Sequence, residues 1–189
     1  MHKFDPSHID RLLRQERQDA IRPEQVLREA GLGEGGVFAD VGCGPGFFTL
    51  PAAAIVGPSG RVWAIDTQPE MLDALKNRGI PANVTLVRSG EAKIPIEDRA
   101  ADLALAAYVL HEAADTVAFL MEILRLLRPG GKLVIIDWKK QQEEHGPPEA
   151  ERITEEEAAA FIASAGFKDV ATSSMNASHY MITAVRPQD

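Results

Sequence analysis

The sequence predicts an α/β domain in which short buried strands alternate with helices. The first observation is the stretch from Val37 to Thr49, where an apolar run broken by Asp40 ends in a glycine-rich turn, and apolar residues at helical spacing follow. The second is that this succession of apolar run, turn and helical spacing recurs along the chain. Such alternation indicates right-handed βαβ units, which build a mostly parallel sheet with helices on both faces.

Two helices are expected before the first strand. The first covers about residues 8–18, with Ser7 in position to cap its amino terminus, and the second begins at Pro23 and ends at Gly31. The charged side chains of the first helix belong either to a solvated face or to a cap over a substrate pocket. These residues are Arg11, Arg14, Glu16 and Arg17.

The remaining elements follow from the same signals. After the glycine turn a helix begins at Phe47 or Phe48, because Pro51 fits only within a first turn, where backbone donors are unpaired. Thr154 and Glu157 form a capping box for a late helix. The other predicted segments are strands at 61–66, 84–88, 101–109 and 132–137, helices at 69–78, 117–127 and 154–165, a turn at 128–131, a polar loop at 139–152, and a closing hairpin of strands 167–174 and 179–186.

Composition excludes several classes of function. The formal net charge of -8 argues against a nucleic-acid partner, because such binding needs Lys and Arg to neutralise phosphates. Cys43 is the only cysteine, so neither an internal disulfide nor a cysteine metal cluster is expected. No apolar run is long enough to span a bilayer and the amino terminus does not resemble a signal peptide, so we expect a cytoplasmic protein with no membrane insertion.

The ligand site of an open α/β sheet lies at the carboxyl ends of its strands. The residues that follow the predicted parallel strands are the glycines of the first turn, Asp66, Ser89, Gly90, Glu91, Tyr108, His111, Asp137 and Trp138. Asp66 suits the two hydroxyls of a ribose, because an ionised carboxylate accepts hydrogen bonds through two oxygens. Both NAD and S-adenosylmethionine contain such a ribose.

Glycine spacing separates these two cofactors. The turn has glycines at 42, 44 and 46, whereas a dinucleotide-binding turn needs its third glycine where Phe47 stands. NAD is therefore disfavoured. The turn amides would suit the carboxylate of the amino-acid tail of S-adenosylmethionine, and Asp40 would help to hold its ammonium group.

Five motifs in order resemble those of the class I S-adenosylmethionine-dependent methyltransferases. They are Asp40-Val-Gly-Cys-Gly-Pro-Gly46, Asp66 with Met71, Ser89-Gly-Glu-Ala92 before Ile94-Pro95, Ala101-Asp-Leu103 leading to Val109-Leu-His111, and Leu127-Arg-Pro-Gly-Gly-Lys-Leu-Val134. The likeness covers about residues 37–165, extends through the final hairpin, and looks closest to the small-molecule branch of the ubiquinone and menaquinone biosynthesis enzymes. It implies a Rossmann-like, seven-stranded sheet with an antiparallel last strand, so residues 1–36 would be an N-terminal helical cap and residues 37–189 the methyltransferase domain of one globular unit.

The resemblance also implies roles for individual residues. Asp66 would hold the ribose, and Tyr108 would lie beside the sulfonium. Glu91 stands where the family more often has Asp facing the adenine amino group, and a solvated loop carboxylate is the alternative interpretation. The complete set expected to bind the cofactor is Asp40, Gly42, Cys43, Gly44, Gly46, Asp66, Thr67, Met71, Gly90, Glu91, Ala92 and Ala107.

His111 and Tyr108 are the candidate catalytic residues. A base is needed only if the acceptor carries a proton, and His111 could remove it because imidazole titrates near neutrality. The alternative is a histidine that packs at a helix start. His111 and Asp115 would share a helical face, but the zinc-protease pattern needs a second histidine at the Asp115 position, so no metal is expected.

Three further features have two interpretations each. Trp138 is either an aromatic wall for the acceptor or a packing residue. The loop at 139–152 either closes over the site or is a loose connection. Cys43 is better explained as a small packing residue than as a nucleophile.

The predicted function is transfer of a methyl group from S-adenosylmethionine to a small-molecule acceptor by in-line displacement. The alternatives are an NAD-dependent oxidoreductase and a non-catalytic protein that binds S-adenosylmethionine.

Overall fold

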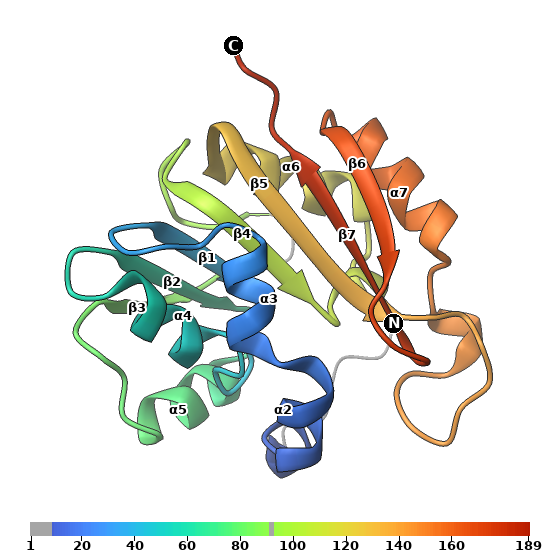
Figure 1. Ribbon diagram of the computed structural model, residues 1–189, viewed down its shortest axis with the longest axis horizontal. Coiled ribbons are helices and arrows are strands. Elements are labelled where there is room, and N and C mark those ends of the chain that lie inside the picture. Colours follow the sequence, from blue (N-terminus) through green and yellow to red (C-terminus); the bar gives the residue numbers. More distant parts are fainter. Residues whose placement is uncertain (1–8, 91–92) are drawn as a thin grey trace.

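The computed structural model describes residues 9–90 and 93–189, which form one sheet between two layers of helices (Figure 1). Within these residues the seven strands lie in the order β3-β2-β1-β4-β5-β7-β6. β1 to β5 are parallel, and β7 is antiparallel to both of its neighbours, as the sequence predicted. The strands are β1 (Val37–Val41), β2 (Arg61–Asp66), β3 (Val84–Arg88), β4 (Ala101–Ala107), β5 (Leu127–Trp138), β6 (Lys168–Ser174) and β7 (His179–Val185).

Helices cover both faces of this sheet. In the view of Figure 1, α3, α4 and α5 lie in front of the sheet and α6 and α7 behind it. α4 begins after Phe48 with Pro51 in its first turn, and α7 begins with the predicted capping box. The bounds are α1 (Ile9–Leu12), α2 (Gln15–Ile21), α3 (Pro23–Glu29), α4 (Thr49–Val56), α5 (Pro69–Asn77), α6 (Thr116–Leu126) and α7 (Glu155–Ser164), with short 3-10 helices η2 (Leu110–Glu112) and η3 (Glu149–Glu151).

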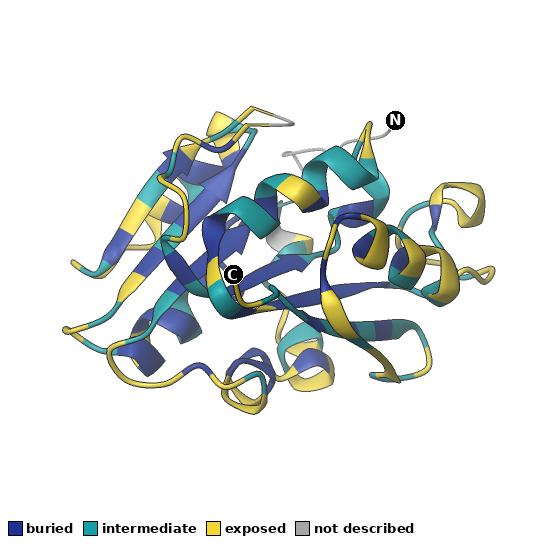
Figure 2. Cartoon of the chain, turned by 90° about the horizontal axis from the view of Figure 1, so that it is seen from above, coloured by how far each residue is buried: buried dark blue, intermediate teal, exposed yellow. Residues whose placement is uncertain are grey.

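β4 shows why both faces of the sheet are apolar. Leu103 and Leu105 pack into the cluster formed with α3, α4 and α5, whereas Ala104 and Ala106 belong to the cluster formed with α6 and α7. Successive side chains of a strand point to opposite faces, so an unbroken apolar run indicates a strand covered on both sides. Figure 2 shows this continuous buried layer along the central strands.

The expected single helix over residues 8–18 is wrong, because α1 ends at Leu12 and α2 starts at Gln15. Arg14 has extended backbone, with φ -60° and ψ 144°, which interrupts the helical hydrogen bonds. The carbonyl of Leu12 instead accepts a hydrogen bond of 2.9 Å from the guanidinium of Arg17. Ser7, the predicted cap, lies outside the described residues.

The two strands beside the site also differ from expectation. β4 ends at Ala107, two residues early, because Tyr108 has φ +62° and leaves the extended conformation. β5 begins at Leu127, so residues 128–131 belong to this strand and do not form a separate turn. A shift of register between Ala101 and Leu103 accommodates the longer strand.

The order in which the chain adds strands to the sheet changes direction at β1: β2 and β3 lie on one side of it, and β4 and β5 lie on the other. β1 pairs with β2 on one side and with β4 on the other. In open α/β sheets the crevice at this switch point holds the ligand.

Candidate functional site

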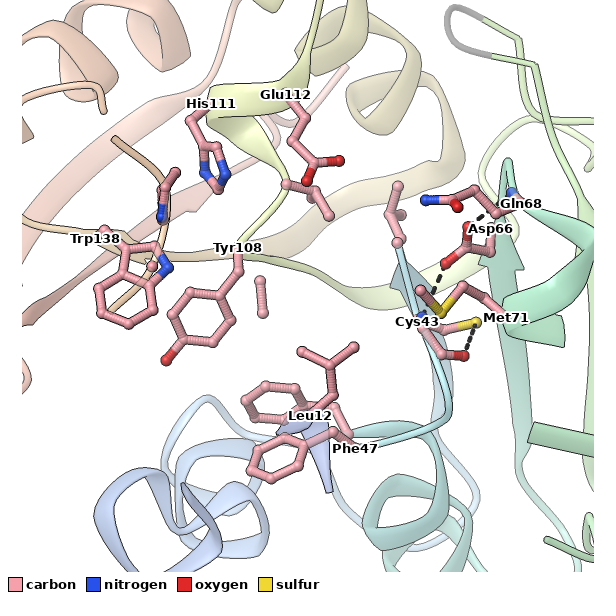
Figure 3. Close-up of a pocket in the computed structure, with 18 of the residues that line it drawn as sticks. Leu12, Cys43, Phe47, Asp66, Gln68, Met71, Tyr108, His111, Glu112 and Trp138 are labelled. Atoms are coloured by element: carbon pink, nitrogen blue, oxygen red, sulfur yellow. Dashed lines mark hydrogen bonds between the residues drawn. The ribbon is translucent and has the colours of Figure 1, made fainter. Parts of the chain in front are cut away.

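A cavity of about 1310 Å³ opens at the carboxyl ends of β1, β2, β4 and β5. Its volume is larger than that of a pocket for one drug-sized ligand, roughly 300–1,000 Å³, so a nucleoside cofactor and a second small molecule fit together. Figure 3 shows the two ends of the cavity: Asp66, Gln68 and Met71 lie at one end, and His111, Tyr108 and Trp138 lie at the other.

The three glycines of the first turn all have positive φ, but they meet different surroundings. A Cβ on Gly42 would lie 2.4 Å from a methyl group of Val109, and one on Gly46 would lie 2.4 Å from a methyl group of Leu75. A Cβ on Gly44 would meet nothing closer than 3.8 Å. Gly42 and Gly44 line the cavity, whereas the described lining does not include Gly46. Gly46 therefore permits close packing behind the turn.

Asp40 is buried behind this turn. Its carboxylate accepts a hydrogen bond of 2.6 Å from the hydroxyl of Thr49 in the first turn of α4. Burial raises the pKa of Asp40 to about 7, so the carboxyl group is partly protonated near neutral pH. Burial also raises the pKa of the Cys43 thiol, which suits a packing residue and not a nucleophile.

Asp66 joins the ends of β1 and β2. Its Oδ2 accepts from the backbone N–H of Gly44 at 2.9 Å, and its Oδ1 accepts from the N–H of Gln68 at 2.9 Å. The carboxylate of Asp66 lines the cavity, and an ionised carboxylate is an acceptor that suits a ligand hydroxyl. Thr67 and Met71 line the cavity next to Asp66.

β3 contributes the next part of the lining. Ser89 and Gly90 border the cavity. Glu91 and Ala92, which the resemblance places beside the adenine, lie outside the described residues.

His111 and Asp137 form a buried pair at the opposite end of the cavity. Nδ1 of His111 lies 2.8 Å from Oδ1 of Asp137, and the imidazole is 6% exposed. Burial alone would lower the pKa of His111, but the hydrogen bond and the charge of Asp137 outweigh it and raise the pKa. Since Nδ1 is engaged, Nε2 is the nitrogen left to exchange a proton with a ligand.

The expectation that His111 and Asp115 share a helical face is wrong. His111 belongs to η2, whereas Asp115 caps α6 by accepting the N–H of Ala118 at 2.9 Å. Among the described residues, no three His, Cys, Asp or Glu side chains gather as metal ligands.

Aromatic side chains form a wall at the His111 end of the cavity. Tyr108 follows Ala107 at the end of β4, and both line the cavity. The ring of Trp138 lies 5.9 Å from that of Tyr108 and 4.4 Å from that of His179. The phenol oxygen of Tyr108 and both ring nitrogens of His179 are buried without a hydrogen-bond partner in the described structure. Burial lowers the pKa of His179 to about 4, so this imidazole is neutral at neutral pH.

His179 was not predicted from the sequence, whereas Arg17 was expected either on a solvated face or in a cap over a substrate pocket. His179 belongs to β7, where it pairs in register with Trp138 of β5, so a register prediction for the hairpin would have found it. Arg17 lies 4.2 Å from the ring centre of Phe47 and 4.8 Å from that of Tyr108. All four charged residues named for this segment, Arg11, Arg14, Glu16 and Arg17, line the cavity, which agrees with the second of these expectations.

The loop after β5 is an ordered part of the site. Arg152 is 3% exposed and donates hydrogen bonds to the carbonyls of Lys139, His145 and Pro147 and to Glu143. Its guanidinium also lies 5.0 Å from the ring centre of Trp138. The loop residues that line the cavity are Glu144, His145, Gly146, Pro147, Pro148 and Glu151. Trp138 therefore both packs under this loop and faces the cavity.

No helix in the described parts of the chain has the length and hydropathy that crossing a membrane requires.

Comparisons with known proteins agree with this architecture. Residues 39–135 match the methyltransferase domain family. A demethylmenaquinone methyltransferase of Staphylococcus aureus (strain JH9) is 31% identical over 121 residues, which are 64% of this chain and 50% of the relative. The chain thus spans about half the length of the curated relatives it matches.

Solved structures show the same fold. The crystal structure of an S-adenosylmethionine-dependent methyltransferase from Aquifex aeolicus matches with a TM-score of 0.91 and 36% identity, over 97% of this chain and 99% of that one. A phosphoethanolamine N-methyltransferase 2 of Haemonchus contortus, solved with S-adenosyl-L-methionine, shares the fold at a TM-score of 0.74 and 17% identity, over 92% of this chain and 53% of that one.

The sheet order and the glycine turn define the Rossmann-like fold of class I S-adenosylmethionine-dependent methyltransferases. The chain belongs to the methyltransferase domain family, whose cofactor is S-adenosylmethionine.

Proposed function

We propose that this protein transfers the methyl group of S-adenosylmethionine to a small-molecule acceptor. The observation that carries this proposal is the hydrogen bond between the backbone N–H of Gly44 and the carboxylate of Asp66. It joins the glycine turn, at one end of the cavity, to the side chain that would hold the ribose. The His111–Asp137 pair lies at the other end. One cavity thus offers a cofactor half and an acceptor half.

The residues present fit the cofactor. Gly44 leaves open space at the turn, and the carboxylate of Asp66 lines the cavity, where it would accept from ribose hydroxyls. Thr67, Met71 and Gly90 would border the adenine, and Gly42, Cys43 and Ala107 would border the methionine part. Asp40 would act from behind the turn on the ammonium group. Gly46 would support the turn by packing on Leu75.

When bound, S-adenosylmethionine supplies a methyl carbon already activated by the sulfonium. The protein therefore has to align the acceptor with that carbon and exclude water. Tyr108 and Trp138 supply apolar faces for the acceptor, and the loop held by Arg152 covers this half of the cavity. Nε2 of His111 removes a proton from the acceptor where the acceptor carries one, and Asp137 holds the imidazole in place.

The small-molecule class of acceptor belongs to this proposal. The relatives in Staphylococcus aureus are named demethylmenaquinone methyltransferases, and the aromatic wall suits an acceptor with a planar apolar body. Residues 1–36 act in this proposal as a helical cap on the methyltransferase domain of residues 37–189, since Leu12 and Arg17 line the cavity. The acidic charge and the single cysteine favour a cytoplasmic location.

Thermal unfolding with ligands tests the cofactor. A ligand at a hundredfold excess over its Kd adds roughly 2.7 kcal/mol of apparent stability. We expect this stabilisation from S-adenosylmethionine and from S-adenosylhomocysteine, its demethylated product. Stabilisation by NAD alone would favour an oxidoreductase and contradict the proposal.

Turnover separates an enzyme from a protein that only binds the cofactor. Incubation with methyl-labelled S-adenosylmethionine and a metabolite mixture should release S-adenosylhomocysteine and label one acceptor. Tight binding without product from any metabolite mixture would favour the binding protein.

A further inference from the structure

Arg17 is a cation in the wall of the cavity that has no carboxylate partner in the described structure. Its guanidinium donates a hydrogen bond of 2.9 Å to the carbonyl of Leu12, and the side chain of Tyr108 also interacts with it. A guanidinium carries five N–H donors, so most of its donor capacity is unused. The aromatic faces of Phe47 and Tyr108 hold the group in place, because a cation is attracted to the face of a ring.

Among the described residues, Arg152 is buried and Arg125 and Arg186 are half-buried like Arg17, and all three are fully engaged. Arg152 reaches Glu143 and three carbonyls, and Arg125 reaches Glu122, Asp98 and two carbonyls. Arg186 reaches three carbonyls between Leu124 and Leu127. Arg17 departs from this pattern in the lining of the cavity.

Burial makes this arrangement costly without an anion. Burial lowers the pKa of Arg17, which means that its surroundings disfavour the charge. Arg17 nevertheless remains charged, since arginine does not deprotonate in proteins. An incoming carboxylate would offset this cost and form two parallel hydrogen bonds, the geometry that guanidinium groups favour.

We propose that Arg17 binds a carboxylate inside the cavity. The inference rests on the proposed function, which supplies two sources for that group. The first is the carboxylate of the cofactor's amino-acid tail, since Phe47 directly follows the glycine turn. The second is a carboxylate on the acceptor, since Tyr108 belongs to the aromatic wall of the acceptor half.

The first arm of the test uses calorimetric titration with two nucleosides. S-adenosylhomocysteine carries the carboxylate, whereas its decarboxylated analogue keeps the ammonium group and the nucleoside. The second arm titrates benzoate and its neutral counterpart benzamide into the protein saturated with S-adenosylhomocysteine. Each arm yields a ratio of affinities, which a general loss of structure does not change selectively.

The variants are Arg17→Gln and the control Arg11→Gln, which removes the same charge from an exposed residue that also lines the cavity. We expect the wild type and Arg11→Gln to favour the carboxylate ligand in one arm by roughly 10- to 100-fold, the effect of a hydrogen bond to a charged group. We expect Arg17→Gln to lose that preference. The arm in which it is lost identifies the source of the carboxylate.

An Arg17→Gln protein that retains every preference of the wild type would overturn the inference, as would a wild type with no preference in either arm. Arg17 would then only fasten α2 to the core. A wild type that binds neither nucleoside would instead contradict the proposed function, so the two failures are distinguishable.

Discussion

Nδ1 of His111 lies 2.8 Å from Oδ1 of Asp137, which joins η2, the short helix that follows β4, to the end of β5. Asp137 is 2% exposed, and its carboxylate also accepts the backbone N–H groups of Trp138 at 2.8 Å and of His111 at 3.3 Å. These three contacts fix the carboxylate, and the carboxylate fixes the imidazole. The ring is therefore oriented before any acceptor arrives.

Replacement of this histidine tests its role as a base. We expect His111→Gln to lower kcat by about 10²- to 10⁴-fold, the usual contribution of a general base, while the Kd of S-adenosylhomocysteine stays unchanged. Unchanged kcat with the labelled acceptor would assign His111 to packing alone.

Asp137→Asn tests the pKa of the same pair. Only neutral His111 accepts a proton, so the rate should rise with pH through a pKa above the ordinary value of 6.5. Without the charge of Asp137 the imidazolium is less favoured, and the rising limb of the pH profile for kcat/KM should move to lower pH. A limb that stays in place, or moves to higher pH, would separate Asp137 from the titration.

His179 predicts a pH dependence of stability. Its folded-state pKa of about 4 lies below the ordinary value of 6.5, so the unfolded chain binds the extra proton first as pH falls. The His179 contribution to the free energy of unfolding is therefore complete above pH 6.5 and is lost towards pH 4. We expect His179→Phe, which keeps a ring beside Trp138, to lose less stability than the wild type over this range in chemical denaturation. Parallel curves for the two proteins would contradict this account.

Gly46 and Gly79 form a matched pair for backbone strain. Both have positive φ, +88° and +81°, but a Cβ on Gly46 would meet Leu75 at 2.4 Å, whereas one on Gly79 would meet nothing within 4 Å. We expect Gly46→Ala to cost about 1–3 kcal/mol more than Gly79→Ala in urea unfolding, because only Gly46→Ala overpacks the core. Equal costs would show that the turn relaxes away from Leu75.

The hydrogen bonds of Arg152 to the loop carbonyls should hold the loop in place over the acceptor half of the cavity. Arg152→Lys removes the fork that reaches three carbonyls, so we expect faster proteolysis and faster amide exchange within residues 139–152. Arg28→Lys is the control, because Arg28 forms an exposed pair with Glu24 on α3. The same protection of the loop in both variants would contradict a role for Arg152.

Local signals were enough to predict much of the fold. The bounds of β2 and β3 follow from glycine and proline residues beside short apolar runs, and the cap of α7 follows from Thr154 and Glu157. The residues before β1 were harder, because their apolar spacing does not reveal the extended backbone at Arg14 that separates α1 from α2. The early start of β5 depends on pairing with Ala101, a contact across the sheet.

In the site, too, features set by local sequence could be predicted, whereas features set by tertiary contacts could not. Asp66 and His111 were found because Asp66 ends β2 and His111 lies shortly after β4, and strand ends converge in a parallel sheet. Different surroundings for Gly42, Gly44 and Gly46 could not be predicted, because Val109 and Leu75 approach them from distant parts of the chain. His179 and Arg17 likewise enter the cavity wall through tertiary packing.

The central claim is that the end of β2 binds the ribose of S-adenosylmethionine, and titration of S-adenosylhomocysteine into two variants tests it most directly. Asp66→Asn changes the side chain that is proposed to bind the ribose. Asp102→Asn is the control. Asp102 also accepts a hydrogen bond from a backbone N–H, that of Val37 at 2.9 Å, but it does not line the cavity. We predict that Asp66→Asn weakens binding by about tenfold or more, the effect of a hydrogen bond to a charged group, while Asp102→Asn binds like the wild type. Equal affinity of Asp66→Asn and the wild type would contradict the account.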